Sequence, residues 1–264
     1  FCALLSEHGQ KRAKPVPMLP KLLQRGQLED ASVSFGRIPL GIDADTLNMV
    51  CLNMERGGTE QVLAMDLLDT VGFAEGIAAL LQQTPDFELY VLDPGKMLSV
   101  DGIDAEHYVT ETPEETVVRL FSLTVERHNA YKTSNGVFPE EMDTHPVVVV
   151  LQGLGRIKSL LTEDGVGKLR LILENTSGKF RLFFWVFDDY RSANVYNTED
   201  WCRGEGIWIG NGVGDQIRLK VNGRVPAAAR NLNFTDGFQV RHGTARQMKL
   251  LVSDRMEAEA EEYE

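Results

Sequence analysis

The chain has 264 residues, of which 43% are apolar, enough for one large domain with a buried core. Its formal net charge of −12 disfavours binding to nucleic acid or to an anionic membrane surface. No stretch approaches the ~18 continuous apolar residues of a membrane-spanning helix. The cysteines are few and scattered, at Cys2, Cys51 and Cys202, which predicts reduced thiols in a cytosolic compartment.

Residues 1–34 are expected to form an arm or linker. The segment 15–23, PVPMLPKLL, sets prolines among apolar side chains, which predicts an extended segment that lays these side chains on a surface: Val16, Met18, Leu19 and Leu22. A disordered end is the alternative. Because Phe1 is not an initiator Met and nothing resembles a signal peptide, we expect the chain to be a piece of a longer protein.

Strand and helix patterns alternate over residues 35–252, which we expect to form one domain. Strands are predicted at 38–42, 49–53, 61–65, 87–93, 145–152, 181–189, 206–210 and 217–221, followed by a hairpin of 237–241 and 244–251. Helices are predicted at 74–81, from 113 to about 131–135, at 166–173, and briefly from 198. The pattern is typical of an α/β fold with a mainly parallel central sheet, flanking helices and an added β-hairpin. Residues 253–264 form an acidic tail that we expect to be frayed.

Two of the predicted helices have recognisable signals. Thr112 is the expected N-cap of the second helix, with Pro113 at its first position and Glu115 closing a capping box. The residues expected on the buried face of this helix are Val117, Phe121, Val125 and His128. The residues expected to face inward from the third helix are Val166, Leu169, Ile172 and Leu173.

The stretch 61–81, QVLAMDLLDTVGFAEGIAALL, has the strand–loop–helix order in which an α/β nucleotide-binding domain carries its phosphate loop. The pattern GxxxxGK followed by Ser or Thr fails in both registers. Counted from Asp66, its last three positions fall on Val71, Gly72 and Phe73. Counted from Met65, they fall on Thr70, Val71 and Gly72. No lysine is present to neutralise phosphates, and Asp66 and Asp69 would repel them.

The strand predicted at 145–152, HPVVVVLQ, also lacks the acidic residue that ATP hydrolysis would need. Its four valines suit a strand buried on both faces of a parallel sheet. In a nucleoside triphosphatase such a strand ends in an acid that holds Mg²⁺ and polarises water. Here it ends in Gln152, whose neutral amide replaces that acid poorly. The loop and the strand end together predict a phosphate site that has lost hydrolysis.

Other candidate groups are weaker. Asp188 and Asp189 end a buried strand, where ligands bind in open α/β sheets, but turn-forming solvated carboxylates are commoner. Asp43 and Asp45 are expected to shape a turn, since no further carboxylate follows at calcium-loop spacing. The histidines are scattered, and no metal or cofactor site is expected. These are His8, His107, His128, His145 and His242.

Several segments of the chain resemble FtsK/SpoIIIE-type ATPase modules, and more specifically the C-terminal, third module of the EssC/EccC motors of type VII secretion. The segments are PVPMLPKLL, IPLGIDADTLNMV, HPVVVVLQGL, EGIWIGNGVGDQIRLKV and DGFQVRHGTARQMKLL. The resemblance covers nearly all of residues 15–251, and GIWIGNG is its most specific piece. The sequence differs from active members of this family at DLLDTVGF and VVVVLQGL. The usual ATP binding of those members is therefore not expected of this chain.

The resemblance implies a RecA-like P-loop NTPase fold, with residues 1–34 as the linker from a preceding module. It also implies a cytoplasmic position within a membrane-anchored motor that engages secreted WXG-type proteins. One hypothesis is a pseudo-ATPase module that recognises substrates or regulates neighbouring modules, with Trp201 and Trp208 on a partner surface unless each packs in the core.

An active NTPase with an atypical loop is the alternative, and a structural spacer is a third reading. The active NTPase would need a cation such as Lys96 or Arg191, or one from a neighbouring module. The isolated module is expected to be a monomer.

Overall fold

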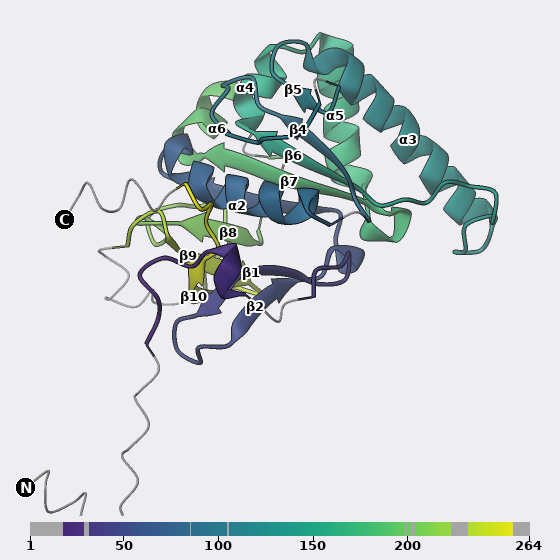
Figure 1. Ribbon diagram of the computed structural model, residues 1–264. Coiled ribbons are helices and arrows are strands. Elements are labelled where there is room, and N and C mark those ends of the chain that lie inside the picture. Colours follow the sequence, from purple (N-terminus) through teal and green to yellow (C-terminus); the bar gives the residue numbers. More distant parts are fainter. Residues whose placement is uncertain are drawn as a thin grey trace, which may run out of the picture.

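A ten-stranded sheet organises the computed structural model, which describes residues 18–28, 32–84, 86–104, 106–198, 200–201, 204–222 and 232–255. The strand order is β2-β1-β10-β9-β8-β3-β7-β6-β4-β5 (Figure 1). The strands are β1 Ile38–Asp43, β2 Met49–Leu52, β3 Thr59–Ala64, β4 Glu88–Leu92, β5 Tyr108–Val109, β6 Val147–Gln152, β7 Leu182–Asp189, β8 Gly206–Ile209, β9 Asp236–Arg241 and β10 Thr244–Leu250.

The sheet has a parallel part and an antiparallel part. The strands β8, β3, β7, β6, β4 and β5 are parallel to their neighbours in that series. The hairpins β1–β2 and β9–β10 join each other and β8 in antiparallel pairs. This confirms the expected α/β fold with an added β-hairpin. Strand β7 lies between β3 and β6, so the carboxyl ends of these three strands meet at one edge.

Helices cover both faces of the sheet. They are α2 Val71–Gln82, α3 Pro113–Thr133, α4 Leu154–Ser159, α5 Glu163–Asn175 and α6 Tyr190–Tyr196, with 3₁₀ turns η1 Arg25–Gln27, η2 Met54–Arg56, η3 Leu67–Thr70 and η4 Gly178–Phe180. Helix α2 packs in one apolar core, and α3, α4 and α5 pack in a second core on the opposite face (Figure 1). None of the described helices has the length and apolar content to cross a membrane.

The apolar runs located most strands correctly, and the short elements were missed. Helix α2 begins at Val71, three residues before the predicted start at Ala74. Helices α4 and α6 and strand β5 were not predicted. The strand predicted at 217–221 is wrong, since only an isolated bridge between Gly204 and Leu219 forms there. The helix predicted from Thr198 is also wrong, because the described residues that follow form a turn.

Helix α3 confirms part of the expected core face, since Val117 is buried and Phe121 packs partly buried against the same core, and the rest of that face is rotated. Its buried residues are Pro113, Val117, Leu120, Thr124 and Arg127, whereas Val125 is 42% exposed. Arg127 is tolerated inside because its guanidinium donates to four backbone carbonyls. The predicted capping box is absent, since the Thr112 side chain makes no cap hydrogen bond.

The described end segments pack on the domain. Leu23 and Leu28 are buried in the core that contains α2, and Leu23 pairs with Leu251. Met18 is 86% exposed, so it does not lie on a surface of the described residues as expected. Residues 1–17, Cys2, Cys202 and the acidic tail beyond residue 255 lie outside the described residues. Cys51 is a free thiol.

Candidate functional site

The loop between β3 and α2 closes into a 3₁₀ turn at the position of a phosphate loop. Asp66 caps this turn by accepting a hydrogen bond from the Leu68 N–H at 3.0 Å. The Asp69 N–H donates to the Asp66 carbonyl at 3.2 Å, and the Val71 N–H donates to the Leu68 carbonyl. A phosphate-binding loop needs such backbone N–H groups free to donate to the anion. In this loop the N–H groups of Leu68, Asp69 and Val71 already have protein acceptors.

A buried hydrogen bond joins this loop to the end of β6. The Gln152 Nε2 group donates to Thr70 Oγ1 at 3.0 Å, and Thr70 Oγ1 donates to the Leu67 carbonyl at 2.7 Å. Both side chains are buried, and Gln152 Oε1 has no partner among the described residues. In an active nucleoside triphosphatase, a hydroxyl at the position of Thr70 and an acid at the position of Gln152 would both bind a Mg²⁺ ion. Here a neutral amide contacts the hydroxyl directly.

The remaining positions that the sequence aligns with the phosphate-loop pattern belong to helix α2. Val71 and Gly72 form its first turn, and the Gly72 carbonyl accepts the Ser253 N–H at 3.0 Å. Phe73 is fully buried, with its ring centroid 6.3 Å from that of Trp185. These three residues therefore pack or cap the fold, and none of their side chains carries a charge that could hold a phosphate.

The charge at this loop is negative. Burial, and then the neighbouring Asp66 carboxylate, raise the pKa of Asp69. Neither carboxylate has an ion pair with a described residue. These two carboxylates make the loop negative, whereas a triphosphate requires a cationic environment.

The two cations considered for an atypical loop differ in their position. Lys96 is exposed and pairs with Glu111 at 3.0 Å, and it follows β4, which is three strand positions from β3. At ~4.8 Å per strand this is about 14 Å from the loop. Arg191 follows β7, whose last residue, Asp189, aligns with Ala64 at the end of β3. Arg191 is exposed and is therefore the better placed of the two.

The carboxylates that end β7 support the fold. Asp189 caps α6 by accepting the N–H groups of Arg191 and Ser192 at 3.0 and 2.7 Å. Asp188 is fully buried, accepts from Thr198 Oγ1 at 3.3 Å and lies 3.6 Å from Arg218. Burial raises the pKa of Asp188 to about 6. Asp188 is therefore buried, not a solvated turn residue.

The remaining sequence candidates have structural contacts. Asp43 accepts the N–H and hydroxyl of Thr46 at 2.6 Å and also binds Arg246. Burial alone would raise its pKa, but the hydrogen bonds from Arg246 and Thr46 lower it to about 2. Turn chemistry thus accounts for Asp43. Within the described ranges, no group of His, Cys, Asp and Glu residues could hold a metal ion.

The two tryptophans considered for partner binding are buried. Trp208 is fully buried and its Nε1 donates to the Asn211 carbonyl at 2.8 Å. Trp201 is nearly buried, with Lys158 Nζ 5.3 Å from its ring centroid. Both rings therefore pack in the domain, as the core alternative expects, and their role in partner binding stays a prediction.

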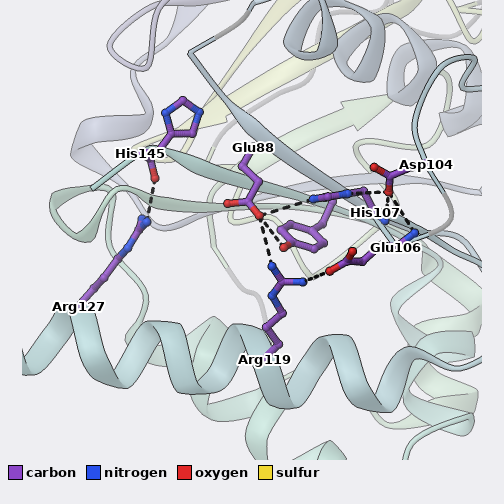
Figure 2. Close-up of polar contacts among 8 residues, drawn as sticks. Glu88, Asp104, Glu106, His107, Arg119, Arg127 and His145 are labelled. Atoms are coloured by element: carbon purple, nitrogen blue, oxygen red, sulfur yellow. Dashed lines mark hydrogen bonds and ion pairs between the residues drawn. The ribbon is translucent and has the colours of Figure 1, made fainter. Parts of the chain in front are cut away.

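A polar cluster that sequence reasoning missed surrounds Glu88, the first residue of β4, whereas the loop follows the carboxyl end of β3. Figure 2 shows the side chains of this cluster. Glu88 accepts from the Tyr90 hydroxyl at 2.6 Å and lies 3.6 Å from His107 Nε2 and 3.9 Å from Arg119. Arg119 also pairs with Glu106. Burial, and then Glu88, raise the pKa of Tyr90. The cluster combines β4 with Arg119 of α3 and with Glu106 and His107 before β5, so no sequence spacing could have found it.

Comparisons with known proteins identify the fold. Neither a family model nor a curated protein matches the chain. The cytoplasmic domain of EssC matches with a TM-score of 0.66 and 16% identity, over 96% of this chain and 51% of that one. Thermomonospora curvata EccC (ATPases 2 and 3) in complex with a signal sequence peptide matches with a TM-score of 0.59 and 18% identity, over 91% and 45%.

A third structure broadens this likeness. The pCW3 conjugation coupling protein TcpA, in a monomer form with ATPγS, matches with a TM-score of 0.60 and 14% identity, over 90% of this chain and 72% of that one. The chain spans about half the length of the EssC and EccC structures. At these identities the matches show the fold alone. The expected P-loop ATPase fold, as found in EssC and EccC cytoplasmic domains, is confirmed.

Proposed function

We propose that the chain is a pseudo-ATPase module of a type VII secretion motor. In this proposal it hydrolyses no ATP, and it acts by engaging secreted substrates or by regulating neighbouring ATPase modules. The observation that carries the proposal is the closed loop, in which Thr70 contacts Gln152 directly and the backbone N–H groups of Leu68, Asp69 and Val71 have protein acceptors.

Electrostatics supports the absence of nucleotide binding. Two like unit charges ~4 Å apart repel by about 1 kcal/mol in water, and by more where they are desolvated. A triphosphate placed at this loop would meet the carboxylates of Asp66 and Asp69 and would find no lysine at the position of the phosphate-binding one. The loop would also have to open, which would break the buried contact between Thr70 and Gln152.

An active NTPase that powers protein export remains the second candidate. Its supporting observation is Arg191, which is exposed beside the end of β3 and could approach an anion after the loop opened. A neighbouring module could supply the missing cation in the same way. The active NTPase requires the loop between β3 and α2 to rearrange, whereas the pseudo-ATPase requires no rearrangement.

The binding role is proposed from the fold. One structure with this fold, EccC, was determined in complex with a signal sequence peptide. By analogy, the partners of this chain would be secreted WXG-type proteins and other modules of the same motor, at the cytoplasmic face of the membrane. We expect no nucleic-acid partner because the net charge is −12. We also expect no direct membrane insertion of this part, and a monomeric isolated module.

The test is a calorimetric titration of ATP·Mg²⁺ into the purified chain, with a phosphate-release assay on the same sample. TcpA titrated in the same buffer provides the positive control. We expect no binding heat up to millimolar nucleotide and no phosphate release above the buffer rate. Binding at micromolar affinity would contradict the proposal, and loss of that binding in Arg191→Gln would favour the active NTPase.

A further inference from the structure

Residues 211–221, which follow β8, form neither a helix nor a strand. Within the described residues, their link to the neighbouring backbone is the isolated β-bridge between Leu219 and Gly204. Two of their side chains, Val213 and Leu219, are buried in the apolar cluster that contains Trp208 of β8. We call residues 211–221 the lid, because they complete the burial of this cluster.

The lid is held in shape by hydrogen bonds within itself. The buried Gln216 side chain donates from Nε2 to the carbonyls of Val213 and Leu219 at 3.2 and 3.0 Å, and its Oε1 accepts the Leu219 N–H at 2.7 Å. Gly210, directly before the lid, has a φ angle of 70°. Glycine reaches positive and negative φ angles with similar ease, so Gly210 can act as a pivot. The lid can therefore move without breaking its own hydrogen bonds.

The charged contact between the lid and the sheet is poorly matched. Arg218 of the lid and Asp188 of β7 are both buried and lie 3.6 Å apart. Among the described residues, the three guanidinium nitrogens of Arg218 have no hydrogen-bond acceptor and Asp188 Oδ1 has no donor. By contrast, Arg241 donates to both carboxylate oxygens of Glu60 at 2.7 and 2.6 Å. The attraction within a buried ion pair offsets its desolvation only when further hydrogen bonds satisfy both groups, so the pair of Arg218 and Asp188 opposes closure of the lid.

This opposition to closure depends on pH. Burial raises the pKa of Asp188 to about 6, against the opposing charge of Arg218 in the lid. The Asp189 carboxylate at the end of β7 raises this pKa, and the Thr198 hydroxyl lowers it. An exposed aspartate has a pKa of ~3.9. The closed lid thus holds a proton on Asp188 more tightly than an open lid would, and rising pH favours opening.

We propose that the lid opens as a unit about Gly210 while the rest of the domain stays folded, and that the buried pair of Asp188 and Arg218 biases it toward opening. Opening separates Asn211 from Trp208, whose Nε1 donates to the Asn211 carbonyl at 2.8 Å in the closed form. The open form exposes Trp208, which is fully buried in the closed form. This inference goes beyond the proposed function and does not depend on the nucleotide loop.

The experiment is native-state hydrogen exchange of the purified chain, followed by NMR. Three N–H groups report on the lid: Gly204, which donates to the Arg218 carbonyl at 3.0 Å, Lys220, which donates to the Gly204 carbonyl at 2.8 Å, and the Trp208 indole, which donates to the Asn211 carbonyl. We expect them to share one opening constant, at least about tenfold larger than that of the β6 and β7 amides. This constant should rise about tenfold between pH 5 and pH 7, as pKa values of about 6 (closed) and ~3.9 (open) for Asp188 require.

A double variant tests the role of the buried pair. Asp188→Leu/Arg218→Met replaces both charges by apolar side chains, so the opening constant of the lid at pH 7 should fall by at least about tenfold and lose its dependence on pH. The control Asp43→Asn/Arg246→Gln removes an ion pair between β1 and β10 and should change the constant by less than about twofold. Circular dichroism of each variant confirms that it is folded.

Three results would overturn the inference. The first is exchange of the lid N–H groups with the same opening constant as the β6 and β7 amides, since the lid would then open only when the whole domain unfolds. The second is a lid opening constant that stays the same between pH 5 and pH 7 in the wild-type chain, a measurement that needs no variant to fold. The third is a larger opening constant in Asp188→Leu/Arg218→Met, which would show that the pair holds the lid closed.

Discussion

The hydrogen bond between Gln152 and Thr70 makes a quantitative prediction about the closed loop. Thr70→Val keeps the side-chain shape but removes the acceptor of the Gln152 amide and the donor to the Leu67 carbonyl. Gln152 is 1% exposed, and its Oε1 already lacks a partner among the described residues, so its side chain would be left unsatisfied at both ends. We expect Thr70→Val to lower the unfolding free energy by about 1–3 kcal/mol.

Removing the Gln152 amide as well should recover part of the unfolding free energy that Thr70→Val loses. Gln152→Leu takes away the buried polar group, so the double variant should be more stable than the sum of the two single losses predicts, by about 1 kcal/mol. Urea unfolding followed by fluorescence gives all the free energies of the cycle. Thr84→Val is the control, since its hydroxyl bonds only the Leu80 carbonyl one helical turn away. Additive losses within about 0.3 kcal/mol would refute a coupled contact.

Three further predictions concern the fold. Burial holds the pKa of Asp188 at about 6, above the ~3.9 of an unfolded chain, so its contribution to the unfolding free energy should fall by on the order of 3 kcal/mol as pH rises from ~4 to ~6. Urea unfolding across this range should show a slope that Asp188→Asn reduces but does not abolish, because Asp69, whose pKa is also raised, contributes with the same sign. Asn leaves Arg218 unpaired. Gly178→Ala would place a Cβ atom 1.8 Å from the Met54 carbonyl and should lower the unfolding free energy by at least about 3 kcal/mol, measured by urea unfolding. Phe73→Ala should lower it by about 3–5 kcal/mol in the same assay, because the ring is fully buried against Trp185.

The sequence predicted the strands because their signals are local. The apolar runs at 145–152 and 181–189 are buried along their whole described strands, β6 and β7. The turn at His242 and Gly243 also follows from local chemistry, since both residues have positive φ angles. The order of the strands could not be predicted in this way. No local pattern indicates that β7 pairs between β3 and β6, because that order depends on long-range packing.

The failures come from contacts between distant residues. On α3, Leu120 and Arg127 are buried where Phe121 and His128 were expected, since the i+3 and i+4 positions both fit an amphipathic helix and only its neighbours choose between them. The candidate site was found only in part. The missing lysine and the neutral Gln152 are visible in the sequence, but the hydrogen bond from Gln152 to Thr70 spans 82 positions and is not.

The most direct test of the closed loop is an amide NMR spectrum of the chain with and without millimolar ATP·Mg²⁺. The signals to follow are those of Leu68, Asp69 and Val71, whose N–H groups would have to leave their protein acceptors to bind phosphate. We predict that these signals stay in place throughout the titration. Saturable shifts confined to these amides would show that the loop opens for a nucleotide, and would contradict the pseudo-ATPase account.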